Sequence, residues 1–72
     1  MTFTVAKRHR RVWIDCDGEP IYTPPNFVRI PDRAAIACLA DAMNAVGRYD
    51  IMAIADFEYR YTPNKKRPEH QR

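Results

Sequence analysis

Basic residues crowd one short segment near the start of the chain, and they could bind an anionic group. Residues 7–11 (KRHRR) place four permanent positive charges in five residues. The planar arginine fork suits phosphate and carboxylate alike, and phosphate contacts would make binding steeply dependent on salt. The alternative is that this segment is solvent-exposed, binds nothing and only improves solubility. We expect these partner-binding residues: Lys7, Arg8, Arg10 and Arg11. We expect secondary basic contacts from Lys65, Lys66 and Arg67.

One aromatic residue follows this segment closely. Trp13 alternates with Val12 and Ile14, which places it on the strand face that also carries Asp15 and Asp17. Tryptophan and arginine dominate binding energy at protein interfaces, so Trp13 is a candidate hot spot. The alternative is that the N-terminal segment covers Trp13.

Catalytic chemistry is not expected from this set of residues. The chain has no serine, and Cys38 has no histidine near it in sequence to act as a base. Asp15 and Asp17 are two residues apart, but a solvated, turn-forming role explains them better than acid–base chemistry. We therefore expect a protein that is not an enzyme and needs no cofactor.

A metal site is not expected either. The only thiols and imidazoles are Cys16, Cys38, His9 and His70, and none forms a pair at metal-ligand spacing. We interpret both cysteines as small buried hydrophobic residues without a disulfide.

The length and charge pattern favour one small binding protein. Seventy-two residues form one domain with a thin core, and no apolar run approaches the roughly 20 residues of a membrane helix. No signal peptide is recognisable, so a cytoplasmic location and no membrane contact are expected. Residues 1–11 and 60–72 are basic, whereas residues 12–59 are acidic. We expect a monomer when the protein is free.

The elements that position these residues begin with a hairpin. Residues 12–17 alternate between apolar and polar, as in a half-buried strand, and Asp17-Gly18 predicts a type I′ turn. A second strand follows over residues 19–23, and Pro20 predicts that it lies at a sheet edge. Phe3 and Val5 fit either a short first strand or a docking segment.

A helix and a further strand are predicted in the second half. Apolar residues recur every three or four positions over residues 33–46, between a capping Asp32 and a terminating Gly47. From Asp50 onward the spacing becomes two, with aromatic residues late in the run, which favours a strand over residues 51–62. A helix through residues 52–55 is the alternative.

These elements predict an α+β fold in which one helix packs on one face of a small antiparallel sheet. The expected organisation is a basic, flexible N-terminal arm (residues 1–11), a folded ββαβ domain (residues 12–62) and a disordered basic tail (residues 63–72).

Residues 4–11 (TVAKRHRR), together with the overall length and charge layout, resemble a family of short phage-encoded proteins that bind host RNA polymerase, as in a Xanthomonas phage. The resemblance implies a transcription regulator that inhibits initiation and acts in antitermination in the host cytoplasm. Its partner would be a large complex, host RNA polymerase, with an RNA contact through the basic termini. Two alternatives stay open: a direct RNA- or DNA-binding module, and an inhibitor of another host complex that uses its acidic face to imitate phosphates.

Overall fold

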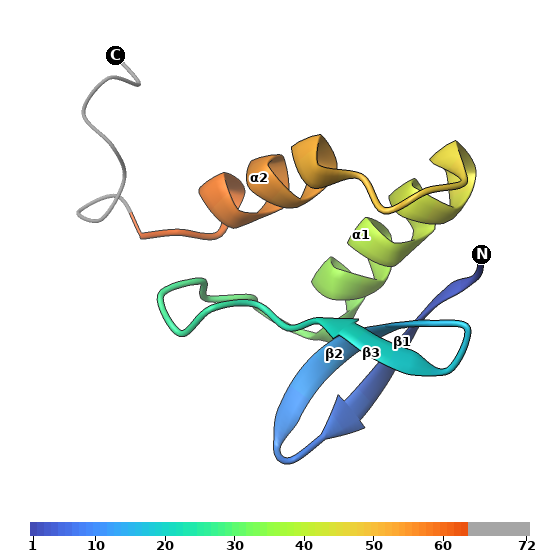
Figure 1. Cartoon of the computed structure of the whole chain (residues 1–72). Coiled ribbons are helices and arrows are strands. Elements are labelled where there is room, and N and C mark those ends of the chain that lie inside the picture. Colours follow the sequence, from blue (N-terminus) through green and yellow to red (C-terminus); the bar gives the residue numbers. More distant parts are fainter. Residues whose placement is uncertain (64–72) are drawn as a thin grey trace.

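The structure is a computed structural model that describes residues 1–63. Three antiparallel strands form one sheet in the order β1-β2-β3, with β1 at Phe3–Arg8, β2 at Arg11–Cys16 and β3 at Glu19–Tyr22. Two helices, α1 (Arg33–Val46) and α2 (Ile51–Arg60), lie on the same side of the sheet (Figure 1). The predicted α+β class is therefore confirmed.

The β2–β3 hairpin follows its sequence signals. Asp17 and Gly18 have φ values of 53° and 89°, which is the positive-φ pair of a type I′ turn. Pro20 lies in β3, an edge strand, where its missing amide hydrogen is tolerated.

The predicted strand over residues 51–62 is wrong, because this segment contains α2. Asp50 caps the helix: its side chain accepts hydrogen bonds from the amides of Met52 and Ala53 at 3.1 and 3.4 Å. Ile54 and Phe57, three residues apart, are buried on one helical face. The period-two face on which the strand prediction rested includes Phe57 but not Ile54, so the buried pair fits helical spacing and not strand alternation.

The third strand is β1, which lies inside the segment predicted to be a flexible arm. The strand reading of Phe3 and Val5 is the correct one, and the folded unit begins before residue 12. Asn44 of α1 fixes the start of β1. Its side chain accepts from the amide of Phe3 at 2.7 Å and donates to the Phe3 carbonyl at 2.8 Å.

Helix α1 begins and ends as predicted. The Asp32 side chain accepts from the amide of Ala35 at 3.3 Å, and Gly47, with φ of 86°, donates its amide to the Met43 carbonyl at 2.8 Å. Cys38 is exposed, so the expectation that both cysteines are buried is wrong for this residue; Cys16 is half-buried, and both thiols are free. The buried core is made of Phe3, Ile14, Val28, Ala35, Ile36, Leu39, Ala40, Met43, Ile54 and Phe57.

Candidate functional site: a basic hairpin tip

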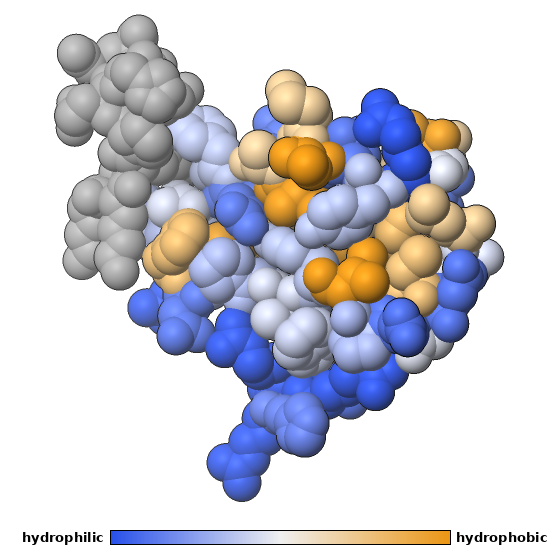
Figure 2. Space-filling view, in the orientation of Figure 1, coloured by the Kyte–Doolittle hydropathy of each residue, from blue (hydrophilic) through white to orange (hydrophobic). Residues whose placement is uncertain are grey.

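The basic segment forms the turn of the β1–β2 hairpin. We call residues 7–11 the hairpin tip. Arg8 pairs with Arg11 across the end of the two strands, and His9 and Arg10 form the two-residue turn with φ values of 52° and 67°. The tip is the lowest part of the molecule in Figure 1, and the same region is a hydrophilic protrusion in Figure 2. The charges are therefore presented by a defined turn at the end of a sheet.

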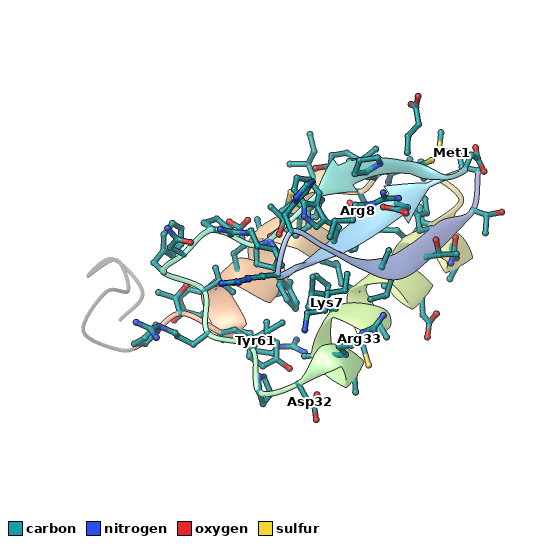
Figure 3. All side chains as sticks on the ribbon, turned by 90° about the horizontal axis from the view of Figure 1, so that it is seen from below. Met1, Lys7, Arg8, Asp32, Arg33 and Tyr61 are labelled. Carbon is teal, nitrogen blue, oxygen red and sulfur yellow. The ribbon has the colours of Figure 1, made fainter. Side chains whose placement is uncertain are left out.

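Arg8 is bound to a carboxylate of the neighbouring strand (Figure 3 labels Arg8). Its Nε and Nη2 atoms donate to the two carboxylate oxygens of Asp15 at 3.3 and 2.6 Å. The Asp15 side chain is only 7% exposed, whereas that of Arg8 is 38% exposed. The hydrogen bond to Asp15 and the attraction between the two charges raise the pKa of Arg8. The solvated role expected for Asp15 is therefore wrong.

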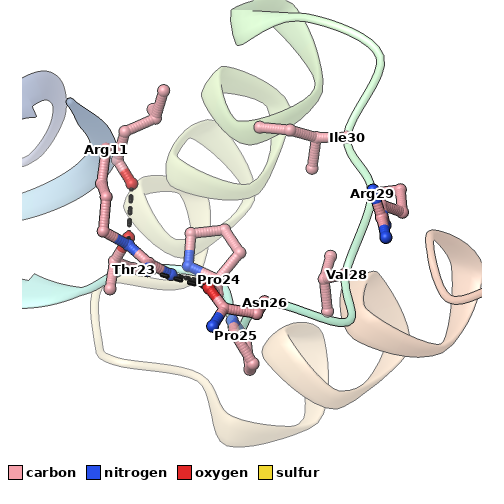
Figure 4. Close-up of a pocket in the computed structure, with 9 residues that line it drawn as sticks. Arg11, Thr23, Pro24, Pro25, Asn26, Val28, Arg29 and Ile30 are labelled. Carbon is pink, nitrogen blue, oxygen red and sulfur yellow. Dashed lines mark hydrogen bonds between the residues drawn. The ribbon is translucent and has the colours of Figure 1, made fainter.

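Arg11 is bound to the loop that follows β3 (Figure 4). Its guanidinium donates to the side chains of Thr23 and Asn26 at 3.4 and 3.0 Å, and to the carbonyl of Pro24 at 2.5 Å. Thr23 in turn donates to the carbonyl of Val12 at 2.8 Å, which extends the contact between this loop and β2. Arg11 and the loop line an open pocket of about 410 Å³. Arg11 thus holds the loop in place and offers little of its hydrogen-bonding capacity to a partner.

Lys7 and Arg10 are the two cations of the tip that remain available. Both are exposed, and within residues 1–63 neither side chain makes a hydrogen bond or an ion pair. His9 is exposed between Arg8 and Arg10, and sequence reasoning did not select it. The signal that could have found it was the hairpin itself, because His9 and Arg10 are its two turn residues.

Trp13 lies on the sheet face that neither helix covers. It is opposite Ala6 and alternates with the core residue Ile14. The ring is half-buried, and its indole N–H is buried without a hydrogen-bond partner among the described residues. The sequence left open whether Trp13 is exposed or covered by the N-terminal segment, and the half-buried ring lies between these two outcomes.

Three further expectations concern the C-terminal basic residues, metal binding and membrane-spanning helices. Lys65, Lys66 and Arg67 lie outside the described residues. Within residues 1–63, no three side chains of histidine, cysteine, aspartate or glutamate are grouped so that they could hold a metal ion. In the same part of the chain, no helix has the length and apolar character needed to cross a membrane.

The fold and the site describe a small α+β protein with a cationic turn at one end of its sheet. Comparison with protein-family models, with curated proteins and with solved structures finds no match for this chain.

Proposed function

We propose that this chain is a non-enzymatic regulator that binds bacterial RNA polymerase through its hairpin tip and thereby alters transcription, by inhibiting initiation and by antitermination. The observation that supports the proposal is the presentation of two available cations by the hairpin, Arg10 on its two-residue turn and Lys7 near the end of β1. The choice of polymerase rests on the resemblance of residues 4–11 to phage proteins of that class.

The neighbouring contacts favour binding because they fix the tip before a partner arrives. Arg8 is held by Asp15, and Arg11 is held by the loop after β3. Less conformational entropy is then lost on association than a disordered arm would lose. A partner surface that carries carboxylate or phosphate groups would suit this tip, because such groups can form ion pairs with both Lys7 and Arg10.

The test is a charge reversal that spares the structural arginines. Lys7→Glu with Arg10→Glu should lower the affinity for purified RNA polymerase at least tenfold, because attraction becomes repulsion at the only two uncommitted cations of the tip. Wild-type affinity should fall as salt rises, since the contact is electrostatic. Affinity is measured by titration of polymerase, and the circular dichroism spectrum should be unchanged.

A matched control has the same change in net charge elsewhere. Arg33→Glu with Arg48→Glu alters one exposed residue at the start of α1 and one just after its end, and should leave the affinity within about twofold of wild type. Equal losses in the two double variants would show that net charge matters and the tip does not. Unchanged affinity after reversal at the tip would reject the proposed contact.

Direct RNA or DNA binding is the second candidate, and the exposed cations of the tip favour it as well. The isolated chain should then shift RNA or DNA in a gel at low salt, and the shift should disappear steeply as salt rises. No shift at low salt rejects this candidate. Pull-down of polymerase that survives nuclease treatment would favour the protein contact over the nucleic-acid contact.

A further inference from the structure

A second unused surface lies at the other end of the β1–β2 ladder. There, Met1, Phe3, Cys16, Ile21 and Tyr49 line an open groove of about 410 Å³. Met1, Tyr49 and Ile21 are 69, 40 and 36% exposed. Phe3 pairs with Cys16 at this end, five residue steps or about 17 Å along the strand from the Arg8–Arg11 pair at the tip.

Further exposed apolar residues adjoin this groove along the chain. Ile51 and Met52, which are 70 and 77% exposed, follow Tyr49 by two and three residues, so they lie within roughly 11 Å of it. Val46, at the end of α1, is 50% exposed. We call the five groove residues with these three the apolar end. Figure 2 shows hydrophobic areas separated by polar ones on the side of the molecule that carries the N-terminus and the α1–α2 connection.

Folding does not explain this exposure. Ile54 and Phe57 are the buried residues of α2, whereas Ile51 and Met52 occupy its first turn and face water. Polar residues at these two positions would leave the core unchanged. A group of large exposed apolar side chains around a groove is the usual mark of a protein-binding surface.

The charged residues beside the groove indicate which kind of binding partner it suits. Asp17 and Glu19 are exposed at the β2–β3 turn, directly beside Cys16, and form an acidic margin on this side of the groove. The cations near the groove are the N-terminal ammonium of Met1 and Arg48, and Arg48 lies 3.8 Å from Asp50. A symmetric pair of this chain through the groove would bring two copies of this acidic margin into one interface, which disfavours a dimer through this surface. A segment with apolar side chains next to lysine or arginine would satisfy both the groove and its acidic margin.

We propose that the apolar end is a docking site for an amphipathic, basic segment of a partner protein. The surface is separate from the hairpin tip, so the proposal does not depend on the tip binding RNA polymerase. With both sites, one small chain could bind an anionic surface at the hairpin tip and an apolar, basic segment at the apolar end.

The three methionines of the chain allow a direct test on the full-length protein. Met1 and Met52 belong to the apolar end, whereas Met43 is fully buried and serves as an internal reference. The probe is a synthetic 18-residue peptide of leucine and lysine at helical spacing. With ¹³C-methyl-methionine protein, the Met1 and Met52 signals should shift on titration and Met43 should stay in place. A peptide with glutamate in place of lysine should bind at least tenfold more weakly.

A surface variant links the binding to the groove. Ile21→Ser with Tyr49→Ser should weaken the leucine–lysine peptide at least tenfold while the Met43 signal keeps its native position, which reports an intact core. Equal binding of the lysine and glutamate peptides, or no shift of Met1 and Met52 with either, would overturn the proposal. Shifts of these two signals with protein concentration alone, accompanied by a doubled mass in sedimentation, would show a second copy as the occupant and would also overturn it.

Discussion

At the scale of single residues, the two hairpin turns of the sheet have the same backbone geometry but different chemistry. Asp17 and Gly18 are residue types that accept positive φ readily, whereas His9 and Arg10 adopt it at a cost. Residues whose backbone is kept in a sparsely populated φ region are typical of functional positions. The strain at His9 and Arg10 therefore supports a binding role for the tip and draws His9 into it.

Replacing the strained turn should separate stability from binding. His9→Asn with Arg10→Gly should raise the free energy of unfolding by roughly 1–2 kcal/mol, because both new residues accept positive φ more easily. The same variant should lose affinity for the partner, since the Arg10 charge is gone. Urea unfolding measures the first effect and partner titration the second.

The other turn supplies the control for this substitution. Gly18 has φ of 89°, and a Cβ atom added there would meet nothing within 4 Å. Gly18→Ala should therefore destabilise the protein by about 1 kcal/mol through backbone strain alone. A His9→Asn, Arg10→Gly variant that is no more stable than wild type would show that the tip is not strained.

At the scale of elements, α2 is joined to the sheet by a hydrogen bond between distant parts of the chain. The hydroxyl of Tyr22 in β3 donates to Oε2 of Glu58 in α2 at 2.6 Å. The amide of Arg29 also donates to the carbonyl of Tyr61, the residue that ends α2, at 2.8 Å. The acidic residue Glu58 thus has a structural contact, as Asp15 does. Fewer carboxylates are left for an acidic face that imitates phosphates.

The Tyr22–Glu58 contact should make stability fall at alkaline pH. Burial, and then the hydrogen bond to Glu58, raise the pKa of Tyr22 well above its usual value of about 10. Above that pH, the unfolded chain loses the Tyr22 proton while the folded chain keeps it, so ionisation favours unfolding. The stabilisation is complete below pH about 10 and is lost as pH rises further. Urea unfolding of wild type between pH 8 and 11 should show this decline.

Two variants test the origin of the decline. Tyr22→Phe should be less stable at pH 8 by about 1–2 kcal/mol, from the lost hydrogen bond, and should show a flatter alkaline decline. Glu58→Gln should keep part of the decline, because burial is the larger cause. Parallel curves for wild type and Tyr22→Phe would contradict the assignment.

At the scale of the whole molecule, the basic tip belongs to the folded body. Phe3 is 2% exposed in the core, and β1 supplies one of the two neighbours of β2. The interpretation of residues 1–11 as an arm attached to a separate domain therefore fails. Function at the tip has to be tested by substitution of side chains.

Removal of the first strand should unfold the protein. A chain that starts at residue 9 loses Phe3 from the core, and loss of such a ring alone costs roughly 3–5 kcal/mol against a typical total stability of about 5–15 kcal/mol. We expect no cooperative thermal transition by circular dichroism. The Lys7→Glu, Arg10→Glu variant, which keeps β1, should retain the transition. A cooperative transition in the truncated chain would show that β1 is dispensable.

The sequence by itself determined the features that depend on neighbours in the chain. Asp32 and Gly47 predicted the ends of α1, and Asp17-Gly18 predicted the turn of the β2–β3 hairpin, because capping and positive φ are local properties. The basic cluster at residues 7–11 is likewise evident from the residue types alone. Local signals did not identify the helix after Asp50, because apolar and aromatic residues at 51, 57, 59 and 61 alternate as in a strand while the buried pair Ile54 and Phe57 is spaced as in a helix.

Only the tertiary structure decided which of the basic residues are available. Arg8 and Arg11 are engaged through contacts with residues 7 to 15 positions away, whereas Lys7 and Arg10 are not. The placement of β1 depends on Asn44, 41 residues from Phe3, and that of α2 on Glu58, 36 residues from Tyr22. Such partners meet only when the chain folds, because side chains so far apart in sequence carry no local signal of their contact.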